Sequence, residues 1–318
     1  MSSTFKSKFN YKLYFLVLLF LPFLLVLFAG LSTLVENIKS GSYFNEFGLT
    51  VIMPAVIIAL TYYSFRFYIT KSPKVEIDER EIRIGDNSIS FSEIDKIRVR
   101  SKHNTYFLIM PYHYSEASSI ILKNGKEYVL YVEHYLNGNL IRVNLNNLNK
   151  YLGGQTSYFK VSTSAVSQKQ PQQFYKEDFH EYRQPPYKFA NYYIFFPFIM
   201  FLIYFVFSFD APVILRSIFL GIALLFYSIL VRQSHYFLVS EDVLIVKNYL
   251  FPWWKRSFPT NSIYQATTEH QPKQELALKI ITTDFRIYRY QSGLMNDSMF
   301  RDLISGLKVR RRVLHQTI

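Results

Sequence analysis

The chain has 318 residues, half of them hydrophobic, with 30 Phe, 26 Tyr and no Cys. The absence of Cys excludes disulfides and thiolate chemistry. The formal net charge is +13, and the sequence lacks the G-x-x-x-x-G-K-[ST] and G-x-G-x-x-G loops that bind phosphates and the G-x-S-x-G nucleophile motif. Only 11 Gly leave little room for a glycine-rich phosphate cradle.

Four apolar runs divide the chain, and each is about 20 residues long, the length that crosses a ~30 Å hydrocarbon core as a helix. They predict transmembrane helices at residues 13–34, 49–68, 190–209 and 211–231. A cleaved signal peptide is the alternative for the first run. That run is too long for the apolar part of a signal peptide and lacks a small-residue cleavage site, which favours an anchor.

Basic residues lie at the outer ends of both predicted helix pairs. Because Lys and Arg near membrane helices favour the cytoplasmic side, we expect a multi-pass protein of the cell (inner) membrane with both termini cytoplasmic. The residues concerned are Lys6, Lys8, Lys12, Arg66, Lys71, Lys74, Arg183, Lys188 and Arg232.

The first polar block alternates apolar and polar residues, the period of a half-buried strand. "EIRI" and "SISF" flank a "GDN" turn, and "SIILKNGKEYVLYV" centres on Asn124-Gly125, a favoured tight-turn pair. "LIRVNLNNLNKYL" closes the block. Its residues Ile141, Leu145, Leu148 and Leu152 share one helical face.

The second polar block follows the same order, which indicates an internal repeat. "YFLVSEDVLIVKN", "SFPTNSIYQATTE" and "LALKIITTDFRIYRY" predict strands. "NDSMFRDLISGLKVRRR" predicts a helix, with residues 296–298 as its N-cap region. Its apolar stripe consists of Met299, Phe300, Leu303, Ile304 and Leu307.

The predicted fold class is a membrane α protein combined with α+β: two transmembrane helical hairpins, each followed by a small antiparallel β-sheet or barrel domain with a C-terminal helix. The predicted divisions are 1–69 (N-terminal tail and first hairpin), 70–152 (first β-domain), 153–188 (polar linker), 189–231 (second hairpin) and 232–318 (second β-domain).

The stretch "FLVSEDVLIVKNYLFPWWKRSFPTNSIYQA" resembles the start of the bacterial pleckstrin-homology-like (PH-like) domains found behind transmembrane hairpins. Phe258-Pro259 and Ile263 match their "[IF]-P-x-x-x-I" element. In the first block, "ISFSEIDKI" has Ile94 and Ile97 at corresponding positions but no Pro. The resemblance covers about half of the chain. It implies seven-stranded folds closed by a helix, a membrane-associated protein and no shared catalytic centre.

The loop "NYLFPWWKRSFP" is the first candidate site, a membrane contact formed by Phe251, Trp253, Trp254, Lys255 and Arg256. Trp prefers the headgroup region, and each basic residue near an anionic leaflet contributes ~1 kcal/mol. The alternative is that these rings pack within the protein, which is the commoner use of aromatic residues.

The C-terminal segment "KVRRRVLH" is the second candidate, an electrostatic patch of Lys308, Arg310, Arg311 and Arg312. The alternative is favourable charge at a helix C-terminus. Arg216, near the start of the fourth run, either reaches the interface or marks a transport pathway. The seven His residues form no tight ligand spacing, so neither a metal nor another cofactor is expected.

These patterns favour a non-enzymatic multi-pass membrane protein that holds two PH-like domains at the cytoplasmic face. The expected partners are membrane lipids and a docked protein or second copy, and nucleic acid is not expected. The alternatives are a transporter or transport-complex subunit and, third, an enzyme at the inner leaflet. The near absence of ionisable residues from the spans disfavours transport.

Overall fold

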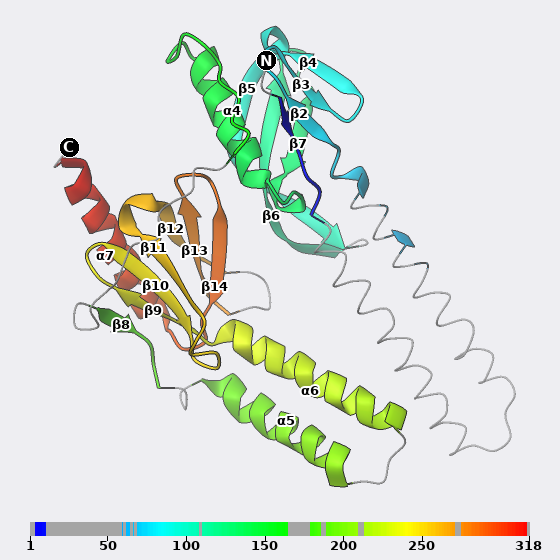
Figure 1. The fold of residues 1–318 in the computed structure, drawn as a ribbon, viewed down its shortest axis with the longest axis vertical. Coiled ribbons are helices and arrows are strands. Elements are labelled where there is room, and N and C mark those ends of the chain that lie inside the picture. The colour runs from blue at the N-terminus through cyan, green and yellow to red at the C-terminus, as the bar shows by residue number, and fades with distance from the viewer. Residues whose placement is uncertain are drawn as a thin grey trace, which may run out of the picture. The chain divides into compact units, whose positions relative to one another are not determined.

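The structure is a computed structural model in which the chain forms two compact units, residues Met1–Ala165 and Val166–Ile318 (Figure 1). Each unit is described by itself. The described residues are 4–10, 59, 62–63, 66, 69–107, 110–164, 179–185, 189–208, 213–270 and 275–316.

Unit 1 contains a four-stranded and a three-stranded antiparallel sheet and a closing helix. The first sheet has the order β1-β2-β3-β4 and the second β5-β6-β7. The elements are β1 (Phe5–Lys6), β2 (Val75–Ile77), β3 (Glu81–Ile84), β4 (Asn87–Ser90), the 3-10 helix η2 (Phe91–Glu93), β5 (Ile94–Phe107), β6 (Met110–Leu122), β7 (Glu127–Tyr131), the 3-10 helix η3 (Val132–His134) and α4 (Gly138–Leu152).

Local sequence patterns account for most of these elements. Gly125 adopts a φ of 83° in the turn between β6 and β7, a conformation that favours Gly, so the tight turn predicted there is confirmed. The helix predicted there is also confirmed, and Ile141, Leu145 and Leu148 of α4 are fully buried against the sheets. Leu152, expected on the same buried face, is instead 41% exposed at the last residue of the helix. Phe159, beyond α4, is buried in the same core.

Unit 2 has the same kinds of sheet, ordered β11-β10-β9-β8 and β12-β13-β14. Its helix α7 caps its first turn with Asn296, whose Oδ1 accepts a bond from the Met299 amide at 2.9 Å, as the sequence predicted. The elements are β8 (His180–Tyr182), α5 (Ala190–Ser208), α6 (Val213–Gln233), β9 (His235–Val239), β10 (Val243–Asn248), β11 (Lys255–Pro259), the 3-10 helix η6 (Thr260–Ser262), β12 (Ile263–Glu269), β13 (Ala277–Thr282), β14 (Ile287–Gln291) and α7 (Asp297–Gln316).

The two units repeat one topology that the sequence patterns only partly indicated. In each, four strands form one sheet, a 3-10 turn leads to three more strands, and a helix follows. In each, the first strand is separated from the second by a long insertion. Phe5 of β1 pairs with Ile77 of β2, and Tyr182 of β8 pairs with Phe237 of β9 beyond α5 and α6. The expected N-terminal tail and the expected linker 153–188 therefore each supply an edge strand.

The predicted fold class, with two transmembrane hairpins, is wrong, and so is the multi-pass transmembrane assignment. The portion of the chain that the structure describes consists mainly of small antiparallel sheets, with four α-helices. Among these described residues, a single helix segment, Asn191–Ser208 of α5, is long and apolar enough to cross a membrane. The apolar portion of α6, Phe219–Gln233, begins after Arg216 and is shorter.

The first two predicted spans fall largely outside the described residues. Residues 13–34 lie wholly outside them, and only four residues of 49–68 lie inside. The prediction counted every apolar run of sufficient length as a span. Run length alone does not separate a span from other apolar helices, and here it overstated the number of spans.

Candidate functional site

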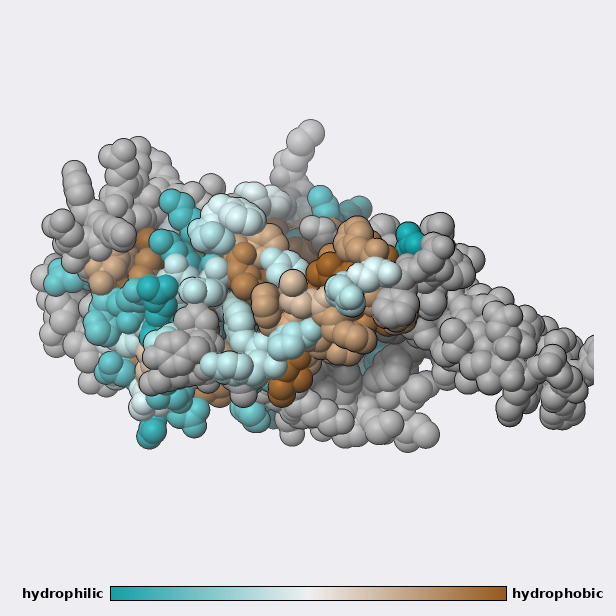
Figure 2. Space-filling view, turned by 90° about the horizontal axis from the view of Figure 1, so that it is seen from below, coloured by the Kyte–Doolittle hydropathy of each residue, from teal (hydrophilic) through white to brown (hydrophobic). Residues whose placement is uncertain are grey.

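Helix α5 exposes large apolar side chains along much of its length. Phe207 is 81% exposed, and Tyr193, Ile194, Phe196, Phe201 and Tyr204 are also exposed. On the face drawn in Figure 2, seen from the side of unit 2 on which α5 and α6 lie, hydrophobic residues gather in the middle and right of the described surface and hydrophilic residues lie mainly toward the left. Contiguous exposed apolar surface of this kind marks a contact with lipid or another molecule.

The opposite face of α5 packs against α6. Ile199 and Leu202 of α5 are buried with Ala223 and Leu230 of α6 in a small core of their own. Phe195 meets Phe226 with ring centroids 5.2 Å apart. The two helices therefore form a pair with a packed inner face and an apolar outer face.

Specific polar contacts join α5 to α6 at the base of this helix pair and join the pair to the end of β14. Asn191 Nδ2 donates to Gln233 Oε1 at 3.0 Å, and the hydroxyls of Tyr192 and Ser234 are 3.0 Å apart. The Gly293 amide, just after β14, donates to the Gln233 carbonyl at 2.9 Å. A Cβ at Gly293 would lie 2.0 Å from the ring of Phe189. A side chain at this position would therefore force the buried Phe189 ring, at the start of α5, to move.

The candidate loop is anchored at the end of α6 by Asn248, the last residue of β10. Asn248 is 2% exposed, and its Nδ2 donates to the Val231 carbonyl at 2.6 Å. Its Oδ1 accepts bonds from the amides of Leu250 and Phe251, each at 3.0 Å. The Tyr249 amide donates to the Ser234 carbonyl at 2.8 Å. The turn of the loop and its place beside the helix pair are thus set by the buried side chain of Asn248 together with the backbone bond of Tyr249.

The structure separates the two tryptophans of the predicted site. Trp253 is 75% exposed and meets Phe251, with ring centroids 5.1 Å apart. Phe251 in turn lies 6.0 Å from the ring of Tyr227 on α6. Trp254 instead packs on the core of unit 2, 6.1 Å from the ring of Tyr290. Only Trp253 is therefore presented to an external surface.

The basic residues of the loop are exposed at the start of β11. Lys255 and Arg256 both face solvent, and the Arg256 guanidinium lies over the Tyr288 ring at 4.9 Å from its centroid. This cation–π contact holds one positive charge close to the aromatic loop. The four basic residues 308 and 310–312 lie within α7, but their side chains are outside the described residues.

His235 links the helix pair to both sheets. Its Nδ1–H donates to the carbonyls of Arg232 at 2.8 Å and Gln291 at 3.0 Å, which fixes the tautomer. Its ring centroid lies 5.5 Å from that of Trp254. Burial lowers the pKa of His235, although the bonds to the two carbonyls oppose the shift.

Acidification is expected to destabilise unit 2 through His235. The folded state has the lower pKa, so the unfolded chain binds more protons, and stability is lost as the pH falls below the unfolded value of about 6.5. Urea unfolding followed by Trp254 fluorescence in a Trp253→Phe background should show a lower midpoint at acidic than at neutral pH. His235→Gln should flatten this dependence. An unchanged dependence in that variant would assign the effect to other groups.

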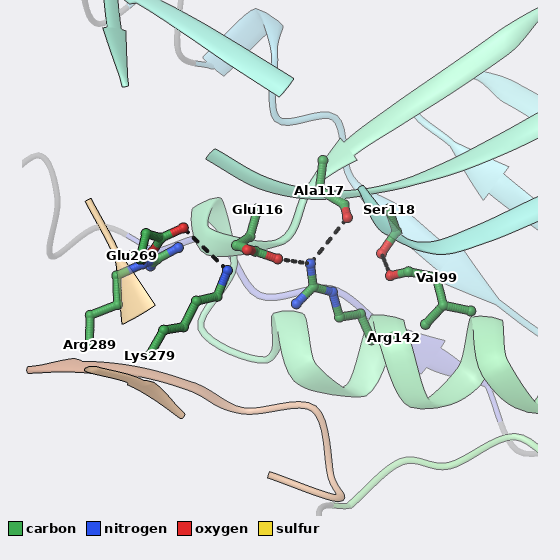
Figure 3. Close-up of polar contacts among 8 residues, drawn as sticks. All are labelled: Val99, Glu116, Ala117, Ser118, Arg142, Glu269, Lys279 and Arg289. Carbon is green, nitrogen blue, oxygen red and sulfur yellow. Dashed lines mark hydrogen bonds and ion pairs between the residues drawn. The ribbon is translucent and has the colours of Figure 1, made fainter. Parts of the chain in front are cut away.

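Two buried ion-pair clusters, one in each unit, were not anticipated from the sequence (Figure 3). In unit 1, Arg142 of α4 is fully buried and donates through Nη2 to Glu116 Oε2 at 2.9 Å and to the Ala117 carbonyl at 3.1 Å. In unit 2, the Glu269 carboxylate accepts a hydrogen bond from Lys279 Nζ at 3.4 Å and another from Arg289 Nε at 2.7 Å. Because each charge has an opposite charge beside it, these clusters are structural. Among the described residues, no group of His, Asp and Glu suits a metal ion.

Comparison with known proteins gives no relative: no family model, no curated protein and no solved structure matches the chain. Function is therefore inferred from the site itself. Sequence reasoning found the aromatic loop by its composition. It missed Asn248 as the anchor of the loop, although an Asn that ends a strand before a turn is a known signal for this role.

Proposed function

We propose that this protein is a non-enzymatic docking protein attached to a lipid membrane through α5. Its two small β-domains, which we propose to be PH-like modules, would be held at the cytoplasmic face. There they would present surfaces to inner-leaflet lipids and to a docked protein or a second copy. The basic residues Arg183 and Lys188 before α5 and Arg232 at the end of α6 support this side of the membrane.

The observation that carries the proposal is the coincidence of two lipid-suited surfaces in one unit. The exposed apolar face of α5 is unsuited to water, and the helix contains the one segment of the described residues long enough to cross a bilayer. The loop bearing Trp253 is pinned beside the base of the same helix pair by Asn248. Trp next to Lys255 and Arg256 is the composition that favours a headgroup layer rich in anionic lipid.

The buried charges support a structural rather than a catalytic use of the β-domains. Arg142 and Lys279 each lie beside a carboxylate within the sheets or between sheet and helix. A protein that docks others through loops and sheet edges needs rigid domains rather than reactive groups. The contacts at the base of α5 would hold the sheets of unit 2 rigidly near the bilayer.

Fluorescence quenching by brominated lipid tests the loop directly, because Trp253 and Trp254 are the only two tryptophans of the chain. We expect the Trp254→Phe variant, which retains Trp253, to be quenched strongly in vesicles brominated near the headgroups. The Trp253→Phe variant, which retains the inward-packed Trp254, should be quenched much less. The two variants serve as matched controls for each other.

The difference in quenching between the two variants is expected only for protein that is bound to the vesicles. Flotation of both variants with the vesicles establishes binding and also tests attachment through α5. If the bound protein shows no quenching of Trp253, the loop does not contact lipid. If neither variant floats with the vesicles, the membrane attachment itself is wrong.

A further inference from the structure

The four-stranded sheet of unit 2, β8 to β11 (Figure 1), carries a row of basic side chains on the face turned away from its core. Lys247 of β10 lies directly opposite Lys255 of β11 on one side and opposite Tyr236 of β9 on the other. Directly opposed residues of antiparallel strands share one face of a sheet, so these three side chains lie together. The neighbours Phe237 and Val246 point to the other face and are fully buried in the core.

Arg183, just after β8, extends this row. Its guanidinium lies over the ring of Tyr236, 5.4 Å from the ring centroid. Glu181, the one carboxylate among the residues of β8 to β11, pairs with Arg183 at 3.0 Å. Lys255 is exposed and Lys247 half-buried, and neither forms an ion pair with any described residue. The basic row consists of Arg183, Tyr236, Lys247 and Lys255.

The outer face of the corresponding sheet in unit 1 pairs its charges instead. Glu76 of β2 lies opposite Lys6 of β1 and Arg83 of β3. Its carboxylate forms ion pairs with Lys6 at 3.8 Å and with Lys74 at 2.7 Å. Arg83 pairs with Glu81. Each of these bases therefore has a carboxylate beside it, unlike the two lysines of the basic row.

The basic row lies on an extension of the sheet that unit 1 does not have. In both units a turn of the same length, closed by a backbone bond, joins the second strand to the third. Counted from this turn, β3 has four residues and β10 has six. The last two residues of β10 are Lys247 and Asn248, and the Asn248 side chain bonds to the Val231 carbonyl of α6. The added length therefore brings the basic row to the base of the helix pair.

The two lysines are like charges placed directly opposite each other, an arrangement that destabilises a sheet. Lysine at a sheet edge can prevent pairing with a further strand, which accounts for Lys255 on the edge strand β11. It does not account for Lys247 on the inner strand β10. An anion bound between the two ammonium groups offsets their repulsion. The arrangement therefore favours an anionic ligand.

The helix pair determines which anion meets the basic row. Tyr236 follows the end of α6 at Gln233 by three residues, at most ~11 Å of chain at ~3.6 Å per residue. With α5 in a bilayer, this short connection holds the row beside the lipid headgroups, where phosphate is the anionic group. Tyr residues are themselves enriched at that interface.

We propose that the basic row binds the phosphate groups of anionic phospholipids in the leaflet next to the end of α6. Lys binds phosphate as a compact point charge, and the guanidinium of Arg183 offers paired donors to the same oxygens. The inference rests on the proposed membrane attachment, because that attachment brings headgroups to this end of the sheet. It adds Arg183, Tyr236 and Lys247 to the lipid contact of the tryptophan loop, with which the row shares Lys255.

Spin-labelled lipids measure this preference directly. The full-length chain is reconstituted in phosphatidylcholine vesicles with a trace of spin-labelled phosphatidylglycerol or spin-labelled phosphatidylcholine, and the fraction of label immobilised by the protein is compared. We expect association of phosphatidylglycerol to exceed that of phosphatidylcholine several-fold. The ratio should fall at least twofold in the double variant Lys247→Gln with Lys255→Gln. It should be retained in Lys247→Arg with Lys255→Arg, which keeps both charges.

The matched control is Lys6→Gln with Arg83→Gln, which removes two positive charges from the outer face of the sheet in unit 1 and should leave the ratio unchanged. Equal association of both labels with the unmodified chain overturns the inference and leaves the membrane attachment standing. A preference that survives Lys247→Gln with Lys255→Gln, or that falls equally in the control, also overturns the inference. If neither label is immobilised, the membrane attachment is wrong and the inference fails with it.

Discussion

Replacing Arg142 with Met is expected to destabilise unit 1 by about 3–5 kcal/mol, the usual cost of breaking a buried ion pair by removing one of its charges. Glu116 is 2% exposed and lies 2.9 Å from the Arg142 guanidinium. Without that guanidinium, the carboxylate must either remain charged in an apolar setting or take up a proton. Hydrogen exchange of peptides from β6 and α4 in the full-length chain measures the loss locally.

Two controls separate the buried charge from the loss of packing. The double variant Glu116→Leu with Arg142→Met removes both charges, and it should recover most of the lost protection, because apolar replacements of buried pairs are often neutral or stabilising. Arg98→Met breaks the exposed contact to Glu127 at 3.8 Å and should cost at most about 1 kcal/mol. If the double variant is as unstable as Arg142→Met, the cost comes from packing and not from charge.

The fold was predictable from sequence where local signals decide it. The Asn124-Gly125 turn, the buried face of α4 and the Asn296 cap of α7 each depend on residues within a few positions of one another. The edge strands β1 and β8 were not predictable in this way. They are two and three residues long, which is too short to show an alternating pattern of apolar and polar residues. Their partner strands lie beyond long insertions in the sequence.

In the candidate site too, the sequence predicted what depends on local composition and did not predict what depends on contacts between distant residues. Composition alone identified the loop with Trp253 and Trp254, because aromatic and basic residues are concentrated there. It gave no means to tell which ring faces outward, since that depends on packing against Tyr290, on a strand distant in sequence. The pairing of Arg142 with Glu116 was hidden for the same reason. Arg142 sits beside Ile141 in a helix whose pattern assigns charged residues to solvent.

Replacing Phe5 with Ala is expected to destabilise unit 1 by about 3–5 kcal/mol, the usual cost of truncating a buried Phe. Phe5 is 2% exposed and lies in the core of unit 1, opposite Ile77 of β2. The Ser7 amide donates to the Val75 carbonyl and the Val75 amide to Ser7 Oγ, both at 2.8 Å. Hydrogen exchange of peptides that cover β2 and β3 should therefore accelerate.

Lys6→Ala is the matched control, because the Lys6 side chain is largely exposed and its amino group lies 3.8 Å from Glu76. It should change stability by at most about 1 kcal/mol. Unchanged protection of β2 in the Phe5→Ala variant would show that residues 5–6 are not part of the sheet. If the variant behaves as expected, the chain leaves the sheet at β1 and returns to it at β2. Both ends of the insertion between them are then held together at one sheet edge, as β8 and β9 hold α5 and α6 in unit 2.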